Sequence, residues 1–192
     1  MVTLPFDRTV AILHFTLVLG LVCQCPAETP ILQTVADPAL QQFQRAVVEY
    51  VGLRATLAKE IVGPSPNSTA AQITATSDGL ARAVQRARPK PPPGAFFDAG
   101  AASALRGKIR ELLAKNAALL EGLDDEVRPR TPDIYDRFPG SAPLSTMPPS
   151  LLAILPTLPP ELEYRLVGED LVLRDIAAAI VLDVLPKALP RE

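Results

Sequence analysis

The chain of 192 residues has little of the chemistry on which most enzyme sites depend. Its single histidine, His14, and its two cysteines, Cys23 and Cys25, all lie near the N-terminus. Zinc and copper sites usually take imidazole or thiolate ligands, and Ser/His/Asp or Cys/His mechanisms need an imidazole to carry the proton. A site in the remainder of the chain would therefore depend on oxygen ligands, lysine and arginine, and we expect no cofactor and no metal.

Short catalytic motifs are also missing from the sequence. It contains no S-x-x-K, no G-x-S-x-G, no G-x-G-x-x-G, no P-loop and no calcium-binding D-x-[DN]-x-[DN]-G spacing. Acid catalysis needs two carboxyl groups across a cleft, with one pKa raised by burial. Adjacent carboxylates on a loop or turn are ordinarily solvated, so a non-enzymatic role is favoured and an enzymatic one stays open. The carboxylates concerned are Asp124, Asp125 and Glu126, Glu161 with Glu163, and Glu169 with Asp170.

The charge balance argues against nucleic acid as a partner. The chain carries 19 basic and 21 acidic residues, a formal net charge of −2, with both signs interspersed. Without a basic stripe, the chain cannot neutralise a row of phosphates. A local cluster of basic residues is interpreted as a solvated helix face; it consists of Arg82, Arg86, Arg88 and Lys90.

The N-terminal segment has the pattern of a signal peptide. Arg8 precedes fourteen mostly apolar residues, 10–23. This length is typical of the apolar region of a signal peptide and shorter than the roughly 20 residues that span a bilayer. Ala27 is a small residue suited to cleavage, so we predict that residues 1–27 are removed and that the protein is exported to the periplasm or beyond. Cleavage would also remove the histidine and both cysteines, and with them any disulfide.

Two alternatives to cleavage remain open. An uncleaved N-terminal segment would anchor the chain in the inner membrane, and this segment would then be its only expected contact with a membrane. A lipid-modified cysteine would make the chain a lipoprotein. Val22 and Gln24, which precede the two cysteines, are not the small residues that lipid attachment requires.

An apolar repeat predicts the first helix of residues 28–127, the region that we expect to be helical. It begins with Asp37 as N-cap and Pro38 in the first turn, and it ends at Gly63 and Pro64. Its apolar residues recur at steps of three, four or seven and gather into one stripe, which we interpret as a core face. They are Leu40, Phe43, Val47, Tyr50, Leu57 and Ile61, while Gln41, Gln44, Arg45, Glu49, Lys59 and Glu60 can face water.

Two further helices are predicted in the same region. The second follows "GPSPNST", with Asn67 or Ser68 as the expected cap and a bend near Gly79. A stiff polyproline break, residues 89–94, precedes the third, which Asp98 is expected to cap. The apolar positions turned inward are Ile73, Leu80 and Val84 in the second helix, and Leu105, Ile109, Leu112, Leu113 and Leu119 in the third.

Prolines are abundant, 21 in all, and many of them gather in residues 128–160. Because proline fixes φ and removes a backbone donor, this segment is expected to be extended. Its apolar residues are too frequent for a disordered linker, so we expect them to hold the segment against the domain surface. They are Ile134, Tyr135, Phe138, Leu144, Met147, Leu152 and Ile154.

The last segment, residues 161–192, has the pattern of a β-hairpin followed by a helix. Apolar and charged residues alternate in "LEYRLV" and "LVLRD", with Gly168 in the turn between them. After Asp175, three alanines and apolar residues at four-residue steps favour a helix, although "AIVLDVL" stays open as a strand. The expected fold is mainly α with a small β element: a helical hairpin or bundle, a proline-rich extended segment, and a C-terminal β-hairpin followed by a helix.

The hairpin is also the candidate interaction surface. A lone hairpin is marginal in water, so it must pack on a helix, and its free edges could accept a partner strand by β-augmentation. A cross-strand contact between Arg165 and Asp175 is expected to stabilise it. The surface consists of Tyr164, Arg165, Glu169, Asp170, Arg174 and Asp175.

The run "APLSTMPPSLLAILPTLPPELEYRLVGEDLVLRDIAAAIVLDVLPKALP", with the upstream "FQRAVVEYVGLRATL", resembles an uncharacterised family of secreted bacterial proteins. Its members have a signal peptide, a helical first half, a P-L-x-T-x-P-P-x-L-L segment and an L-E-Y-R-x-V-G-x-x-L-x-L-R-D ending. The resemblance covers most of the chain after residue 27 and is most specific in the C-terminal third. It departs around residues 64–130, and the alanines at 177–179 replace polar residues. It implies export and this fold, and no activity.

The sequence therefore favours a non-enzymatic exported envelope protein that binds another protein, or a wall or membrane component. The apolar stripes and the hairpin edge support binding, and the sequence contains no recognisable set of catalytic residues. The alternative is a periplasmic ligand binder or hydrolase that uses only carboxylates, Tyr164 and Arg165.

Overall fold

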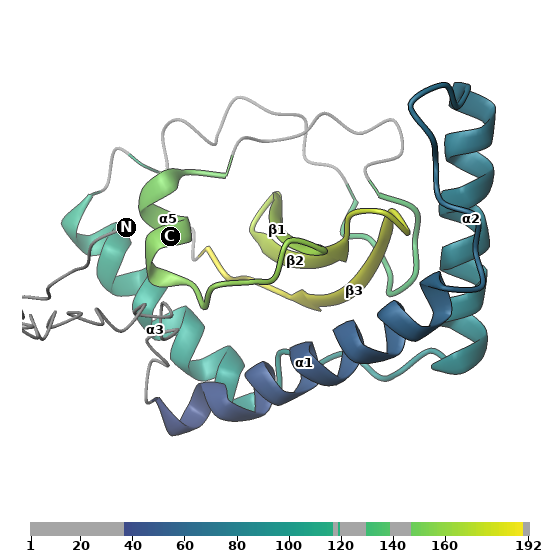
Figure 1. The fold of residues 1–192 in the computed structure, drawn as a ribbon. Helices are drawn as coiled ribbons and strands as arrows, with labels where there is room; N and C mark the ends of the chain where they lie inside the picture. The colour runs from purple at the N-terminus through teal and green to yellow at the C-terminus, as the bar shows by residue number, and fades with distance from the viewer. Residues whose placement is uncertain (1–36, 117–118, 120–129, 139–146, 190–192) are drawn as a thin grey trace, which may run out of the picture. The chain divides into compact units, whose positions relative to one another are not determined.

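The computed structural model describes residues 37–116, 119, 130–138 and 147–189 (Figure 1). The expected signal peptide, its histidine and its cysteines lie outside the described residues, as do the carboxylates at 124–126 and Leu144. The described residues form four helices and a three-stranded antiparallel sheet, so the expectation of a mainly helical chain with a small β element is confirmed. The elements are α1 (Pro38–Ala58), α2 (Ala70–Ala87), α3 (Ala99–Lys115), α5 (Pro149–Ile154), β1 (Leu162–Val167), β2 (Asp170–Asp175) and β3 (Ile180–Leu185).

α1 begins as the sequence predicts. The Asp37 carboxylate accepts a hydrogen bond from the Ala39 amide at 3.1 Å, and Pro38 occupies the first turn. The helix ends at Ala58 and not at Gly63, because the amides after Ala58 bond to carbonyls three residues back and tighten the chain into turns. Its apolar stripe is a core face: Leu40, Phe43, Val47 and Tyr50 are buried, and Leu57 and Ile61 are half-buried.

α2 differs from the prediction at its N-terminus. Thr69 is the cap, and neither Asn67 nor Ser68 is: its hydroxyl accepts from the Gln72 amide, and the Gln72 side chain accepts from the Thr69 amide. This reciprocal pair is a capping box. Leu80 and Val84 are buried as predicted, but Ile73 is 50% exposed, so its inward placement was wrong. Residues 70–75 are all exposed, which means that the first half of α2 extends beyond the core.

α3 begins where the sequence predicts but ends at Lys115, so Leu119, an inward position of the predicted helix, lies beyond it. Asp98 caps it by accepting from the Ala101 amide at 2.8 Å. Leu105, Ile109 and Leu113 are buried. α1 packs against both α2 and α3, and α3 also packs against α5.

β1 and β2 form the predicted hairpin. Leu162 lies opposite Asp175 and Val167 opposite Asp170, which leaves Gly168 and Glu169 as a two-residue loop. Gly168 has a φ of +60° at the first loop position, as a type II′ turn requires.

The segment after the hairpin is a third strand, so the predicted C-terminal helix was wrong. The Asp175 carboxylate accepts from the Ala178 amide at 2.8 Å, but it caps only the turn at 176–179. Ala179 then takes a left-handed φ of +49°, which stops a right-handed helix. β3 pairs with the second edge of β2, and this pairing satisfies backbone groups of a strand that is buried throughout. The long-range pairing overrides the helix propensity of the alanines.

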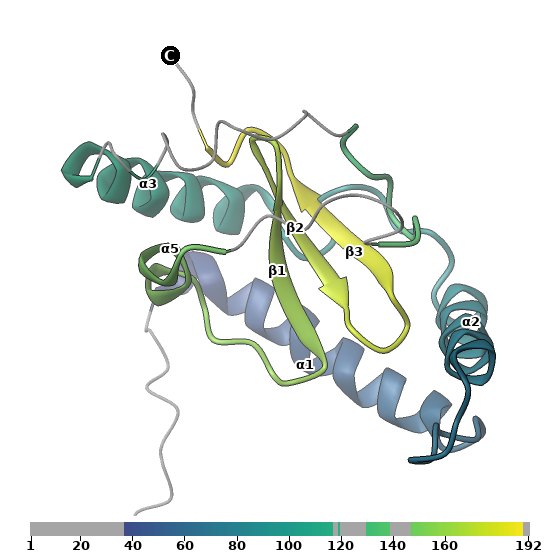
Figure 2. The same ribbon diagram turned by 90° about the horizontal axis from the view of Figure 1, so that it is seen from above.

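The sheet has α1 across one face (Figure 2), and it separates two groups of buried apolar residues. α1 crosses one face, where Phe43 stacks on Tyr164 with 6.4 Å between ring centroids, and this face belongs to the main core. The other face carries a smaller cluster that contains Phe138, Val167, Val172 and Val181.

The described parts of the proline-rich segment are held by their apolar residues as expected. Residues 130–138 lie beside β3, where the Tyr135 amide donates to the Val181 carbonyl at 2.8 Å. The segment is not extended throughout, because α5 forms within it. Among its predicted anchors, Ile134, Phe138 and Met147 are buried, Tyr135 and Ile154 are half-buried, and Leu152 is 45% exposed.

Candidate functional site

The predicted interaction surface is largely inside the molecule. Tyr164, Asp170, Arg174 and Asp175 are buried, and Asp175 has no exposed area. Arg165 and Glu169 are half-buried. A partner can therefore reach only the last two of these side chains without a change in the fold.

Asp175 joins the sheet to α1. Its Oδ2 atom accepts from the Tyr50 hydroxyl at 2.8 Å and from Arg54 Nε at 2.7 Å. Burial, and then the negative charge and hydrogen bond of Asp175, raise the pKa of the Tyr50 phenol far above its ordinary value. The phenol therefore remains a donor. The predicted Arg165–Asp175 contact was wrong, since the register places Asp175 opposite Leu162.

Arg165 instead belongs to an ion-pair group on the face of the sheet away from α1. Glu163 bridges two cations, with one oxygen 2.7 Å from Arg165 Nη2 and the other 2.5 Å from Arg174 Nε. Arg174 also donates to the Phe138 carbonyl at 2.8 Å and lies over the Phe138 ring. Burial lowers the pKa of Arg174, and the neighbouring Glu163 charge opposes that shift. Glu163 is thus one carboxylate for two guanidinium groups, and the Nε atoms of Arg165 and Arg174 are buried without a hydrogen bond to any of the described residues.

The remaining candidates also make internal bonds. Asp170 accepts from the Thr131 hydroxyl and, at 2.8 Å, from the Lys187 amide. The Tyr164 hydroxyl donates to the Pro156 carbonyl at 3.1 Å, and burial raises the pKa of this phenol. Glu169 accepts from the Leu189 amide through its carbonyl oxygen. Most side chains of the predicted interaction surface therefore stabilise the fold.

Asp183 is a buried carboxylate that the sequence analysis overlooked. It has no exposed area and accepts from the amides of Phe96 at 2.7 Å and Phe97 at 2.8 Å, and from Gly94 at 2.9 Å. A β-bulge makes this possible: Leu173 pairs with Asp183 but Arg174 pairs with Val181, so Leu182 is an extra residue. The available signal was a single aspartate within the apolar run "IVLDVL".

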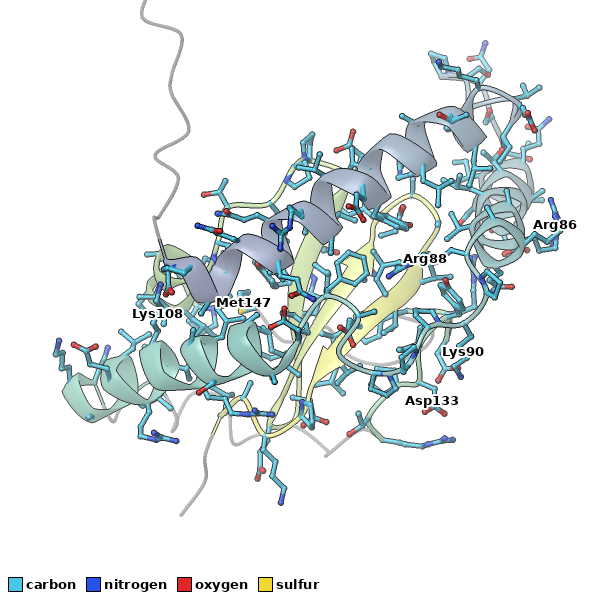
Figure 3. All side chains as sticks on the ribbon, turned by 90° about the horizontal axis from the view of Figure 1, so that it is seen from below. Arg86, Arg88, Lys90, Lys108, Asp133 and Met147 are labelled. Carbon is cyan, nitrogen blue, oxygen red and sulfur yellow. The ribbon has the colours of Figure 1, made fainter. Side chains whose placement is uncertain are left out.

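The basic cluster at the end of α2 divides into two kinds of residue. Arg82, Arg86 and Lys90 are exposed, as predicted for a solvated face. Arg88 turns the other way, toward the sheet, whereas Arg86 points outward from α2 (Figure 3). The Arg88 guanidinium lies 4.6 Å from the centroid of the Phe96 ring, a cation–π contact.

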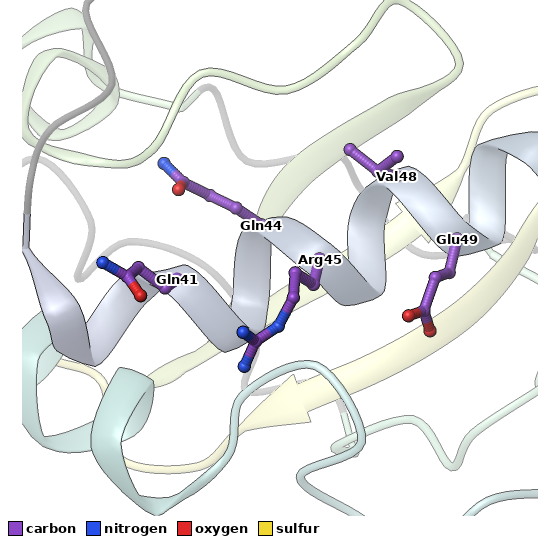
Figure 4. Close-up of a pocket in the computed structure, with 5 residues that line it drawn as sticks. All are labelled: Gln41, Gln44, Arg45, Val48 and Glu49. Carbon is purple, nitrogen blue, oxygen red and sulfur yellow. The ribbon is translucent and has the colours of Figure 1, made fainter.

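The outer face of α1 carries an open hollow of about 430 Å³ (Figure 4). Its lining residues are spaced three, four, seven and eight positions apart and therefore share one side of the helix. Val48, the one apolar residue among these five, is 72% exposed. From the sequence, the polar members of this set are predicted only to face water. We name the set the α1 outer stripe: Gln41, Gln44, Arg45, Val48 and Glu49.

A second hollow, of about 380 Å³, adjoins the stripe where α1 and α3 begin. The two helix starts pack closely: a Cβ added at Gly100 of α3 would lie 3.6 Å from the Ala39 carbonyl oxygen of α1. Gln41 and Arg45 line both hollows, so the two form a continuous open surface. Lys108 adds a cation nearby, 3.5 Å from Asp37.

Two further features, a metal site and a membrane-spanning helix, are absent from the described residues. No group of three or more His, Cys, Asp or Glu side chains among them could hold a metal ion. None of the helices that the structure describes is long and apolar enough to cross a membrane. Against known proteins, no family model matches the chain, and no curated protein or solved structure matches it significantly.

Proposed function

We propose that the protein is an exported, non-enzymatic envelope factor that binds another protein through the α1 outer stripe. The observation that carries the proposal is a contrast in how side chains are used. The buried carboxylates Asp175 and Asp183 accept from internal donors, and Arg174 pairs with Glu163, whereas the stripe presents two amides, two opposite charges and an exposed valine around an open hollow.

The shape of the hollow favours a protein over a small substrate. Small-molecule sites are concave, enclose most of the ligand and converge a few polar groups on it. The α1 outer stripe is instead one side of a single helix. Protein interfaces combine apolar and polar side chains, and the stripe has both, with exposed Val48 beside the polar side chains of Arg45 and Glu49 (Figure 4).

Export is supported by the N-terminal pattern and by the resemblance of the C-terminal third to secreted bacterial proteins. Cleavage after Ala27 would leave a chain without histidine or cysteine, and this composition disfavours the hydrolase alternative. N-terminal sequencing of the protein recovered from the periplasmic fraction tests export. A chain that still begins at Met1 in the cytoplasm would contradict it.

A photocrosslinking amino acid at position 48 of the tagged full chain tests binding. The expected result is one discrete adduct in the envelope, which is lost when Arg45→Glu is added because the charge of the stripe is reversed. Position 62 is the matched control, since Val62 is 89% exposed but lies outside the stripe. Equal adducts from positions 48 and 62, or a free monomer that hydrolyses a substrate, would contradict the proposal.

A further inference from the structure

The α1 outer stripe continues toward the C-terminal end of α1. Gly52 and Ala55 follow Val48 at steps of four and three residues, on the same side of the helix, and both are exposed. A Cβ added at Gly52 would meet no atom within 4 Å. No other element that the structure describes lies across this side of α1, which faces away from the sheet (Figure 1). Val48 and two small residues therefore form an open helix face.

The charges of this face are few and opposite in sign. Arg45 and Glu49 are the only charged residues at exposed positions of α1. Neither side chain forms an ion pair or a hydrogen bond with any of the described residues. Both point to one flank of the helix, whereas Gln44 and Val48 point to the other (Figure 4). The face thus has no net charge, and a partner that matches it must also present one charge of each sign.

We infer that the partner at the α1 outer stripe is a second copy of this chain, bound through an antiparallel pair of α1 helices. The inference rests on the proposed function, because it names the partner at the same surface. Soluble oligomers are most often closed two-fold dimers, in which one patch meets the same patch of the other copy. Such a patch must be complementary to itself in charge, and a patch that carries Arg45 and Glu49 meets this condition.

An antiparallel pair with its two-fold axis at Val48 matches these charges. Because an α-helix rises about 1.5 Å per residue, Arg45 of one copy and Glu49 of the other would lie only about 3 Å apart along the helix direction. This two-fold axis keeps each flank on its own side, so the two charges face each other, and they do so twice in the dimer. A parallel pair would instead bring like charges to the same level.

The same axis places small residues opposite long ones. Val48 meets Val48 of the other copy, Gly52 lies at the level of Gln44, and Ala55 lies at the level of Gln41. The distance between two packed helices depends on the side chains at their contact. Gly52 and Ala55 leave room for the glutamine side chains, so the two helices can approach closely.

Sedimentation velocity of the purified protein, over a series of concentrations, tests the dimer. Arg45→Glu and Glu49→Arg each bring like charges together twice in the dimer, so each is expected to raise the dissociation constant about tenfold or more. The double variant Arg45→Glu/Glu49→Arg restores opposite charges and is expected to dimerise like the unaltered chain. A double variant no better than the single ones would overturn the antiparallel pairing.

A mixture of the two single variants is a sharper test of self-association. In a dimer of one Arg45→Glu chain and one Glu49→Arg chain, both charge pairs are again opposite in sign. Mixing is therefore expected to recover the dimer at a concentration at which each variant alone is monomeric. Arg82→Glu, which reverses an exposed charge on α2, is the matched control and should leave the dissociation constant unchanged. A mixture that stays monomeric, or equal effects of Arg82→Glu and Arg45→Glu, would overturn the inference.

The mass of the photoadduct at position 48 separates this inference from the proposed function. With the purified chain alone, the adduct is expected at twice the mass of one chain. A purified chain that gives no such adduct, together with an adduct of a different mass in the envelope, would overturn the second copy and leave the proposed function in place. The lack of an adduct in both preparations would contradict both.

Discussion

Asp175 at the end of β2 and Arg54 on α1 lie 121 residues apart in sequence, yet Arg54 Nε is 2.7 Å from the Asp175 carboxylate. The carboxylate has no exposed area, and the arginine side chain is 14% exposed. Tyr50 donates to the same oxygen at 2.8 Å. This contact links the end of the sheet to the helix that crosses it. Tyr50, Arg54 and Asp175 therefore have a structural role.

Asp175→Asn is expected to lower the free energy of unfolding by about 3 kcal/mol, because it leaves Arg54 without its counter-charge in a nearly buried site. Urea unfolding measures the change. Arg45→Ala on the exposed side of the same helix should change it by less than about 0.5 kcal/mol. Equal effects of the two substitutions would show that the Arg54–Asp175 pair does not tie the sheet to α1.

Asp183→Asn tests the carboxylate that holds the start of α3. Its oxygens accept from the amides of Gly94, Phe96 and Phe97, and an amide nitrogen in place of one oxygen would oppose a donor with a donor. A loss of about 1–3 kcal/mol is expected in urea unfolding. Asp133→Asn, whose side chain is 61% exposed, is the control and should have little effect.

The tyrosines predict how stability depends on alkaline pH. Burial is the main cause that raises the pKa of Tyr50 and of Tyr164, and it also raises that of Tyr135. In the unfolded chain these phenols ionise near pH 10, so above that value the unfolded state holds fewer protons than the folded one. Stability is therefore full below about pH 10 and falls as the pH rises further.

Absorbance of tyrosinate and circular dichroism, recorded together, measure this prediction. The phenols of Tyr50 and Tyr164 should ionise only in the step in which the secondary structure is lost. Ionisation of all three tyrosines near pH 10 in a chain that keeps its circular dichroism would contradict their burial.

Two glycines predict effects of opposite sign. Gly168→Ala should destabilise the hairpin by about 1 kcal/mol, since Gly168 has a φ of +60°. Gly107→Ala, inside α3 with open space around the added Cβ, should stabilise the chain by about 0.4–1 kcal/mol. Thermal unfolding of both variants checks the signs, and a gain in stability for Gly168→Ala would exclude the proposed turn.

Local signals explain where the sequence predicted the fold correctly. Asp37 and Asp98 stand directly before apolar repeats, and each accepts from an amide in the first turn of its helix. The hairpin register follows from alternation and from Gly168 in the turn. These features depend on residues that are neighbours in the chain. Thr69 with Gln72 three residues later is also a local signal of a capping box. The cap was instead predicted at the neighbouring Asn67 or Ser68, which have the same capping preference.

Long-range contacts explain where the prediction failed. Residues 176–185 have a local preference for helix, but β2 needs a partner on its second edge. The sequence shows Asp183 only as a charge within an apolar run. A β-bulge in β3 orients its carboxylate toward the amides near Phe96. The predicted interaction residues on the hairpin are buried for the same reason, since α1 and residues 130–138 cover the sheet. The second hollow depends on α3 beginning beside α1, which no local pattern shows.

The most direct test of the account compares two variants of a chain that carries the photocrosslinker at position 48, with the melting temperature of each. The account predicts that Arg45→Glu abolishes the adduct and leaves the melting temperature unchanged. It predicts that Asp175→Asn lowers the melting temperature and keeps the adduct while the chain is folded. Two results would contradict the separation of the binding surface from the buried residues that stabilise the fold. One is an adduct that persists in Arg45→Glu, and the other is the loss of the adduct in Asp175→Asn while that variant is folded.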